Sequence, residues 1–545
     1  MSTLNAVFDI AKTALQANQK AINVTSHNIA NANTAGYTRQ RVVLETMNPV
    51  NFGGQFFGTG VEVAAVERVY DSYQSIQLRD AQSGLSRFEA RGQHLAGLES
   101  IFNDFDGAGL STRLDAFFNS AADVAANPSS YGERAAMLSN ARVLSDTFNH
   151  AATNLERNLA SVNSVITGKV DDINGLATRI AGFNQQISSI ELSGTSANDL
   201  RDKRDLLLEE LSGLVDISVT ENDIGQVDVY VGGSFIVAAN KTATLTVEPY
   251  PRDIDTPSLM LNGGTINSRI TGGTLKGDLE GIAYYKDARE RINLLSASII
   301  KEVNLQHAEG FGLDGAPGAD FFSPLSVYAN ANSANSGGAA ITSAAVTDLG
   351  ALTLDDYEIR FSGPGAYNIV NLDTDEVVSN GLYASGGAIL FEGLSVVITD
   401  SPKTPQAGDR FVVSATRNAA FEMTVDLTDP RKIAASGTST GLPGDNTNAL
   451  AIAELKDGSF TGNTTFSQFY NSIVTDLGTA GRDAKINYDA QGKFTQELRA
   501  AKEAVSGVSI EEEAINLVKL QRAYEAAAKV LSTVDQMMDT ILRLR

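Results

Sequence analysis

Ser439 has the sequence neighbours of a serine nucleophile. It lies at the centre of Gly-Thr-Ser-Thr-Gly, residues 437–441, which matches the G-x-S-x-G spacing of many hydrolases. A nucleophile of this kind must sit on a sharp turn between a strand and a helix. Here Leu-Pro-Gly follows at residues 442–444, so no helix is expected directly after the serine. The sequence therefore predicts a surface turn and no catalytic residue.

Metal chemistry has no better support. The four histidines lie far apart and lack the spacing of a zinc motif: His27, His94, His150 and His307. Two acidic stretches, DFDG at 104–107 and NLDTDE at 371–376, begin like calcium loops but do not continue with the further oxygen ligands. The chain has no Cys, which excludes disulfides and thiolate sites. We expect no metal, no cofactor and no enzymatic activity.

Amide side chains are concentrated near the N-terminus, in and just before SHNIANANTAGYTRQRVVLE, residues 26–45. Four of them fall within eleven residues: Asn23, Asn28, Asn31 and Asn33. Asn bonds to nearby backbone and tolerates left-handed geometry, so it suits helix ends and turns. Gly36 permits a turn before Tyr37, and the following residues alternate like a strand. Capping does not explain all the amides, which could also link packed subunits, so we include Asn28, Asn31, Asn33, Gly36 and Tyr37 in a candidate assembly interface.

Both ends of the chain carry an apolar period of 3.5 residues, the pattern of a coiled-coil seam. The N-terminal seam runs through Leu4, Phe8, Ala11, Leu15, Asn18, Ile22, Thr25 and Ile29. The C-terminal seam runs through Leu517, Leu520, Tyr524, Ala527, Leu531, Val534, Met538 and Ile541. Ser509 and Glu512 have the spacing of a capping box, which predicts where the C-terminal helix begins.

Two interpretations of these seams remain open. In one, they are ordinary amphipathic helices docked on a globular core. In the other, the two ends pair with each other and with neighbouring subunits, and the apolar and aromatic seam residues larger than Ala belong to the assembly interface. Seams at both extreme termini favour the second, because chain ends usually fray unless something holds them. Asn18 and Thr25 weaken the N-terminal seam, so we expect both ends to be largely disordered in the free protein and to order on assembly.

The charge of the chain is concentrated in its middle. The net charge is -23, which disfavours nucleic acid as a partner. Residues 1–42 carry one acid and four bases, and residues 509–545 carry six acids and five bases, so the two ends are nearly neutral. Near-neutral ends can pack against copies of themselves, while an acidic middle stays soluble. No run approaches the roughly 20 apolar residues that span a bilayer, and the N-terminus lacks a signal-peptide pattern, so we expect no membrane insertion.

Hydrophobic periodicity predicts an α+β multidomain protein with terminal coiled-coil-like helices, a long-helix bundle and inserted β-rich parts. We expect helices over about 70–104, 109–126, 131–165, 168–192, 197–212, 274–309 and 463–506, the last with an undecided break at 478–494. The expected parts are a terminal helix and turn (1–45), a first bundle part (46–212), a small β module (213–265), a second bundle part (266–320), an outer β-rich insertion (321–450), a closing bundle helix (451–507) and a C-terminal helix (508–545).

Two terminal motifs carry a family resemblance. NIANANTAGYTRQ at 28–40 and QRAYEAAAKVLSTVDQMMDTIL at 521–542 resemble the ends of bacterial flagellar axial proteins, which include rod, hook and hook-associated proteins. Four further stretches resemble the hook-associated protein 1 family, at 109–130, 134–149, 198–219 and 284–315. The resemblance covers about residues 1–320 and 450–545.

This resemblance implies a structural protein of the extracellular flagellum, at the junction of hook and filament. It implies self-assembly into a ring that contacts the hook protein and a second junction protein on the filament side. It also implies secretion by type III export, which needs no cleaved signal, after a transient cytoplasmic stage in which an export chaperone holds the C-terminal helix. The alternatives are a hook or rod protein, or a surface protein that binds a ligand in the β insertion through Tyr357, Tyr367 or Tyr383.

Overall fold

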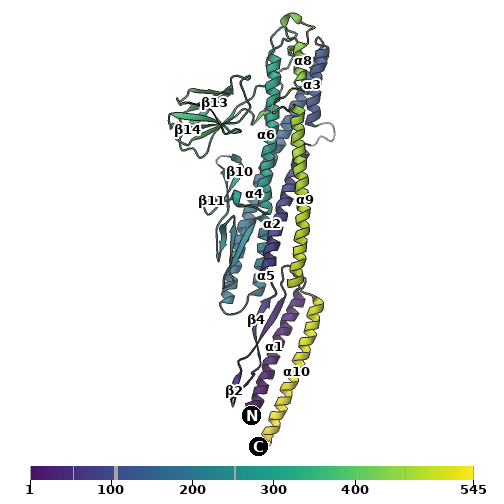
Figure 1. Cartoon of the computed structure of the whole chain (residues 1–545), viewed down its shortest axis with the longest axis vertical. Helices are drawn as coiled ribbons and strands as arrows, with labels where there is room; N and C mark the ends of the chain where they lie inside the picture. The colour runs from purple at the N-terminus through teal and green to yellow at the C-terminus, as the bar shows by residue number, and fades with distance from the viewer. Residues whose placement is uncertain are drawn as a thin grey trace.

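The protein is elongated, with both termini at one end, a long helical bundle in the middle and β-sheets on one flank (Figure 1). This computed structural model describes residues 2–52, 54–102, 109–250, 253–401, 403–460 and 462–543. The acidic stretch at 104–107 lies outside the described residues. The helices are α1 (Ser2–Asn31), α2 (Ser72–Ile101), α3 (Leu110–Ala126), α4 (Tyr131–Glu191), α5 (Asn198–Leu214), α6 (Gly273–Ala308), α7 (Ala419–Glu422), α8 (Thr447–Glu454), α9 (Phe466–Ser506) and α10 (Ile510–Arg543).

The strands fall into six antiparallel sheets within the described residues. Two small sheets lie near the N-terminal helix, and they pair β1 (Gln40–Thr46) with β4 (Val61–Arg68) and β2 (Val50–Phe52) with β3 (Gln55–Phe57). The small β module contains β5 (Ile217–Glu221), β6 (Val227–Val231), β7 (Ser234–Ala238), β8 (Lys241–Thr242), β9 (Thr246–Tyr250), β10 (Asp253–Leu261) and β11 (Gly264–Thr265). The outer domain contains β12 (Tyr328–Ala331), β13 (Ala340–Val346), β14 (Tyr357–Gly363), β15 (Ala366–Asn371), β16 (Val377–Leu382), β17 (Ala388–Phe391), β18 (Leu394–Thr399) and β19 (Arg410–Ser414).

The bundle is built on four long helices: α2, α4, α6 and α9. Helix α2 packs against α9, α6 and α5, and α4 packs against α3, α6 and α5. Their apolar residues recur at steps of three and four, which places one face of each helix in a shared core. Pro128 lies between α3 and α4, where the expected helices over 109–126 and 131–165 also part.

Helix α4 corrects one expectation from the sequence. We expected two helices, over 131–165 and 168–192, but residues 131–191 form a single helix of 61 residues, about 90 Å long. Gly168 costs about 1 kcal/mol relative to Ala in a helix. Buried Ile166 and Val170 lie on either side of it and continue the apolar face, so packing outweighs the glycine. Helix α9 likewise runs without interruption through residues 478–494.

The small β module is attached to the bundle by a buried amide. Asn184 of α4 donates to the carbonyl oxygens of Val227 (2.7 Å) and Ala239 (2.6 Å), and its own oxygen accepts from the Val227 N–H (3.1 Å) and Arg204 (3.1 Å). These four bonds use the full capacity of the side chain. One residue thus fixes the start of β6 and the end of β7 against two helices.

The outer domain is a two-sheet sandwich that stands off the side of α6 (Figure 1). Its sheets have the orders β12-β19-β14-β15-β16 and β13-β18-β17. Tyr357 is buried between them and meets Phe391 edge to face at 5.2 Å. Tyr383 is half-buried and donates to Asp400 (2.8 Å), and Tyr367 is half-buried beside Phe361. These three tyrosines therefore serve the packing of the sandwich and do not gather at an open groove.

Candidate assembly site at the terminal helices

Helices α1 and α10 form an antiparallel pair that extends beyond the lower end of the bundle (Figure 1). Helix α1 also packs against β1 and β4. The expectation that the two ends of the chain pair with each other is met in this structure. The pair meets the bundle at a joint made by residues 28–40, β4, the first turns of α5 and the segment between α9 and α10.

The buried face of α1 differs from the predicted seam. Its buried residues are Ala11, Ala17, Ala21, Thr25 and Asn28. The predicted large seam residues are only half-buried: Leu4, Phe8, Leu15, Ile22 and Ile29. Ala11 and Thr25 are seam positions and are buried as predicted. Elsewhere the buried residue lies one position before the predicted one: Ala17, Ala21 and Asn28 are buried in place of Asn18, Ile22 and Ile29. The physical reason is that α1 is enclosed from two sides, by α10 and by β1 with β4, so only small side chains fit the centre.

The predicted seam of α10 agrees better with the structure. Val534 is buried, and five more seam residues are half-buried: Leu517, Leu520, Ala527, Leu531 and Met538. Tyr524 and Ile541 remain exposed. Ser509 accepts from the Glu512 N–H (3.4 Å) as expected of an N-cap. The Glu512 carboxylate instead faces Arg39 at 3.5 Å, so the capping box is only half formed by these contacts.

Asn28 is the centre of the Asn-rich stretch. Its nitrogen donates to the Gln40 carbonyl oxygen (2.8 Å) and to Glu513 of α10 (3.1 Å). Its oxygen accepts from the Gln40 N–H (3.0 Å) and from the Tyr37 hydroxyl (2.8 Å). All four hydrogen-bonding positions of the amide are used, and the side chain is buried. One residue therefore joins α1, the turn, β1 and α10.

The other amides act locally. Asn31 donates to the His27 carbonyl oxygen (3.0 Å) and accepts from the Thr34 hydroxyl (3.2 Å), which is the capping role expected at the end of α1. Asn33 is exposed. Gly36 has φ +77°, a left-handed conformation that favours glycine, although an added Cβ would meet only ordinary contact with Leu206 at 3.5 Å. These residues shape the turn that brings Tyr37 to Asn28.

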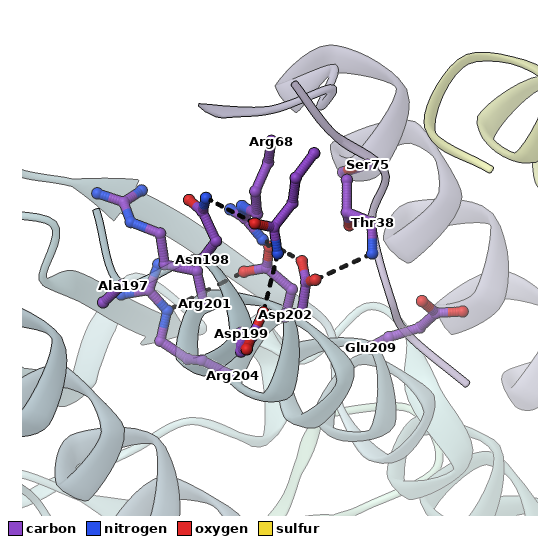
Figure 2. Close-up of polar contacts among 12 residues, drawn as sticks. Thr38, Arg68, Ser75, Ala197, Asn198, Asp199, Arg201, Asp202, Arg204 and Glu209 are labelled. Atoms are coloured by element: carbon purple, nitrogen blue, oxygen red, sulfur yellow. Dashed lines mark hydrogen bonds and ion pairs between the residues drawn. The ribbon is translucent and has the colours of Figure 1, made fainter. Parts of the chain in front are cut away.

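The N-terminal turns of α5 hold the strands of the joint (Figure 2). Asp202 accepts from the Thr38 N–H (2.9 Å) and from Arg68 of β4 (2.8 Å), and Arg68 also donates to Asp205 (2.7 Å). The amide of Gln40 donates to Asp199 (2.8 Å). Acidic residues three apart thus lie on one face of α5 and bind both β1 and β4.

The charges in this joint are partly desolvated. Arg68 and Asp202 are each 6% exposed. Burial lowers the pKa of Arg68, but the Asp205 and Asp202 carboxylates outweigh burial and hold that pKa above its ordinary value. Burial, with the nearby carboxylates of Asp199, Asp202 and Glu513, raises the pKa of Tyr37, which keeps its hydroxyl a donor to Asn28. Removing one partner from such a buried pair is expected to leave an uncompensated charge.

A second set of contacts connects the joint to the end of α9. The Arg39 N–H donates to the Ser506 carbonyl oxygen (2.9 Å), and Lys502 donates to Glu209 of α5 (3.0 Å). An open cleft of about 450 Å³ lies beside these contacts, lined by the turn at Gly36, the middle of α5, the start of α2 and the end of α9. The segments that connect the terminal pair to the bundle are therefore bonded to α5 or to each other.

Sequence reasoning missed this role of α5, which we expected only as a bundle helix. Its signal was the run Asn-Asp-Leu-Arg-Asp-Lys-Arg-Asp at 198–205, which repeats an acid at every third residue. The pattern indicates an acidic helix face, but it does not say that the partner is a strand more than 130 residues earlier in the chain.

The structure also locates the residues that could carry chemistry, within the part of the chain that it describes. Ser439 begins a 3₁₀ turn, Ser439–Gly441, and the next helix starts only at Thr447, so the strand–turn–helix of a nucleophile elbow does not occur there. The described residues contain no cluster of three or more His, Asp or Glu side chains placed to hold a metal ion. Among the helices that the structure describes, none is long and apolar enough to cross a membrane.

Comparisons with known proteins identify flagellar families along the chain. Residues 95–322 match the family described as "Flagellar hook-associated protein FlgK helical domain", and residues 330–415 match "Flagellar hook-associated protein 1, D2-like domain". The terminal segments 8–38 and 504–544 match the "Flagella basal body rod protein" and "Flagellar basal body rod FlgEFG protein C-terminal" families. The flagellar hook-associated protein 1 of Escherichia coli (strain K12) is 30% identical over 99% of this chain and 100% of its own length.

The chain belongs to the flagellar hook-associated protein 1 family. A second relative in this family, flagellar hook-associated protein 1 of Bacillus subtilis (strain 168), is 27% identical over 98% of this chain and 97% of its own. The structure of the flagellar hook junction protein FlgK from Burkholderia pseudomallei has the same fold, with a TM-score of 0.68 at 22% identity, over 79% of this chain and 100% of that chain. As a member of the hook-associated protein 1 family, the chain is a structural protein of the flagellum.

Proposed function

We propose that this chain is the subunit that joins the flagellar hook to the filament, and that α1 and α10 are its assembly device. One observation carries the second part: the pair projects beyond the bundle with large apolar side chains exposed on both helices. Among them are Val7 and Ile10 of α1 and Ile515, Val530 and Met537 of α10. A soluble protein that exposes such surface usually uses it to bind another protein.

The proposed partners follow from the family and from this geometry. Copies of the chain pack into a ring through their terminal helices, with the hook protein on one side of the ring and a second junction protein on the filament side. The candidate interface includes the half-buried seam residues of both helices and the turn at residues 28–37. The joint on α5 supports this role because it holds the terminal pair at a defined angle to the bundle.

Export and localisation are part of the same proposal. The protein acts outside the cell in the flagellar axial structure, after type III export and a transient cytoplasmic stage. In the cytoplasm, the exposed apolar side of α10 needs a cover, and an export chaperone on this helix supplies it. The exposure of Ile515, Val518 and Met537 supports such a cover.

A sedimentation experiment tests the proposed function. Full-length protein and a version lacking residues 1–41 and 509–545 are each mixed with isolated flagellar hooks and sedimented. We expect only the full-length chain to sediment with hooks, and electron microscopy to locate it at the hook tip. If neither version binds, the junction role is wrong. If both bind, the contact lies in the bundle and the terminal helices serve export or chaperone capture.

A double variant tests the helix pair itself. Leu520→Asp with Leu531→Asp places two charges in the contact between α10 and α1, which should abolish incorporation while leaving the bundle folded. The matched control is Gln521→Asp with Ser532→Asp, which adds the same charges one residue later, at exposed positions. A seam variant that still joins hooks would show that the pairing of α1 with α10 is dispensable for assembly.

A further inference from the structure

An apolar groove lies between the first turns of α1 and the β2–β3 hairpin. It has a volume of about 770 Å³, and its apolar lining comes from Val7, Ile10, Met47, Val50 and Phe57. Val50 is 56% exposed and Phe57 is 50% exposed, although both face this hollow. A groove of this composition is suited to an apolar helix rather than to a charged ligand.

A complementary ridge runs along α10. Its exposed apolar residues follow one another at steps made of threes and fours: Ile515, Val518, Ala526, Val530, Met537 and Ile541. The first five positions lie away from the seam that faces α1, which uses Leu517, Leu520, Leu531 and Val534, while Ile541 lies on the line of that seam and is exposed near its end. Helix α10 is therefore apolar on two sides, and its own chain covers one of them.

The groove and the ridge lie on different sides of α1. Helix α1 packs against α10 on one side and against β1 and β4 on another, and the hairpin, α1 and α10 appear in that order across the lower end of the molecule (Figure 1). The ridge cannot fold back into the groove of the same chain, because α1 separates them. Two complementary surfaces at different places on one molecule join copies head to tail.

The two surfaces also lie at the same level along the pair. Asn28 of α1 contacts Glu513 of α10 where the two helices leave the joint. At 1.5 Å per residue, residues 5–16 of α1 lie about 18–35 Å below that contact. The same distance along α10 reaches about residues 525–536, which include Val530 of the ridge.

Charge favours the same match. Lys12 and Lys20 of α1 are exposed and form no ion pair with other described residues, and the same is true of Asp535 and Asp539 of α10. Asp9 also lines the groove and offsets one of these lysines, so residues 2–31 carry a net charge of +1; residues 524–541, which include Lys529, carry a net charge of -2. Opposite charges beside two apolar surfaces favour their alignment between copies.

We propose that the groove formed by α1 and the β2–β3 hairpin of one copy receives the outer ridge of α10 from a neighbouring copy. This inference rests on the proposed assembly function and names its lateral contact. Such a head-to-tail contact closes into a ring when the rotation between copies closes, and otherwise continues as a helix. The β2–β3 hairpin then contacts α10 of a neighbouring copy as well as lying beside α1 of its own chain.

Site-specific crosslinking tests this contact, because the chain has no cysteine of its own. One preparation carries Val50→Cys in the groove and a second carries Val530→Cys on the ridge, and both positions are exposed enough to tolerate the change. The two are mixed, assembled on isolated hooks and oxidised. We expect disulfide-linked dimers from the mixture, at least tenfold more than from either preparation alone. A chain with both substitutions should give a ladder of linked multimers.

Matched controls locate the contact. Asn51→Cys lies next to Val50 on the opposite face of the strand, and Ser532→Cys lies at the level of Val530 but off the ridge. Asn51→Cys should not crosslink in place of Val50→Cys, and Ser532→Cys should not crosslink in place of Val530→Cys. If assembly on hooks proceeds but no ridge position from 515 to 541 crosslinks to Val50→Cys, the inference is wrong while the proposed function stands. Crosslinks of Val50→Cys to itself or to hook protein also overturn it, and a chain that does not join hooks overturns both.

Discussion

The two ends of this molecule are built from long helices but bury opposite kinds of side chain. At the upper end, Phe117, Phe118, Phe321 and Phe322 pack together with ring centroids 5.0–5.7 Å apart and are almost completely buried. At the lower end, the buried face of α1 consists of Ala, Thr and Asn, and the larger apolar residues remain half-buried or exposed. The upper end is complete within one chain, whereas the lower end has apolar surface left for neighbours.

Hydrogen bonding does not account for this difference. Asn28 at the lower end and Asn304 at the upper end are both buried and both bonded on each side of the amide. Asn304 donates to the Phe322 carbonyl oxygen (2.8 Å) and accepts from the N–H groups of Phe321 and Phe322 (both 2.9 Å). Buried hydrogen bonds therefore fix the backbone at both ends, and the two ends differ in how much apolar side-chain surface they bury. Since burial supplies most of the stability of a domain, the two ends should differ strongly in how firmly they are ordered.

Hydrogen exchange should show the largest contrast. In the free protein we expect the backbone amides of α1 and α10 to exchange at least about a thousandfold faster than those of α4 and α6, because fraying segments open at almost no free-energy cost. Assembly on hooks should slow exchange in α1, α10 and the β2–β3 hairpin, and leave α4 and α6 unchanged. Mass spectrometry of the free and assembled protein measures both. Strong protection of residues 2–31 in the free protein would mean that the terminal pair is stable without neighbours.

Core truncation compares the same two ends thermodynamically. Phe117→Ala should lower the free energy of unfolding by about 3–5 kcal/mol, because a fully buried aromatic ring is replaced by a cavity. Leu531→Ala, in the half-buried seam of α10, should change it by less than about 1 kcal/mol in the free protein. Denaturant unfolding followed by circular dichroism measures both. Similar losses for the two variants would show that the terminal pair is as well packed as the bundle.

The sequence predicted the local elements well, because apolar residues recur over short stretches with the period of a helix or a strand. The ends of α1, α3, α5 and α6 lie within a few residues of the expected positions, and the seam of α10 matches. The continuity of α4 through Gly168 was missed, because tertiary packing on Ile166 and Val170 decides it. Local propensity alone does not contain that information.

The candidate site was predicted only in part, for a related reason. The Asn-rich turn was recognised, and capping by Asn31 followed from its place at a helix end. The bonds from Asn28 to Glu513 and from Thr38 to Asp202 join segments 485 and 164 residues apart, and nothing in the local pattern couples them. The shifted face of α1 arises from enclosure on two sides, which a single period cannot express.

Acid should weaken the upper end through His307. This histidine is fully buried, its Nε2 accepts from the Ala434 N–H (2.9 Å) and its Nδ1 donates to the Ala319 carbonyl oxygen (2.6 Å), so the ring must be neutral. Burial lowers its pKa from 6.5 to about 4. Between these values the unfolded chain binds the proton and the folded chain does not, so stability is full above pH 6.5 and falls as pH drops towards 4.

The loss assignable to His307 between pH 7 and pH 4 is roughly 3 kcal/mol. Carboxylates titrate in the same range, so the measurement is a difference between variants. Denaturant unfolding of His307→Gln should be less sensitive to pH than that of the original chain by this amount, even if the variant is less stable at pH 7. His150→Gln is the control, since it replaces an exposed histidine on α4. Equal pH profiles for all three chains would exclude His307 as the acid-sensitive group.

The smallest effect concerns the amide at the joint. Asn28→Ala removes four hydrogen bonds and leaves the Gln40 N–H and carbonyl groups and the Tyr37 hydroxyl without this partner in a buried place. Asn33→Ala, five residues later and exposed, removes an amide of the same kind from the surface. In the assembled state, Asn28→Ala should weaken protection of β1 and the adjoining turns of α1 and α10 by about 1–3 kcal/mol, and Asn33→Ala by almost nothing. Exchange of these amides on hooks measures the difference, and because α3 lies at the opposite end of the molecule from the joint, its exchange is the internal reference. Equal effects of the two substitutions would mean that the Asn-rich stretch acts through its surface, as a direct link between subunits, and not through the buried bonds that orient the terminal helices.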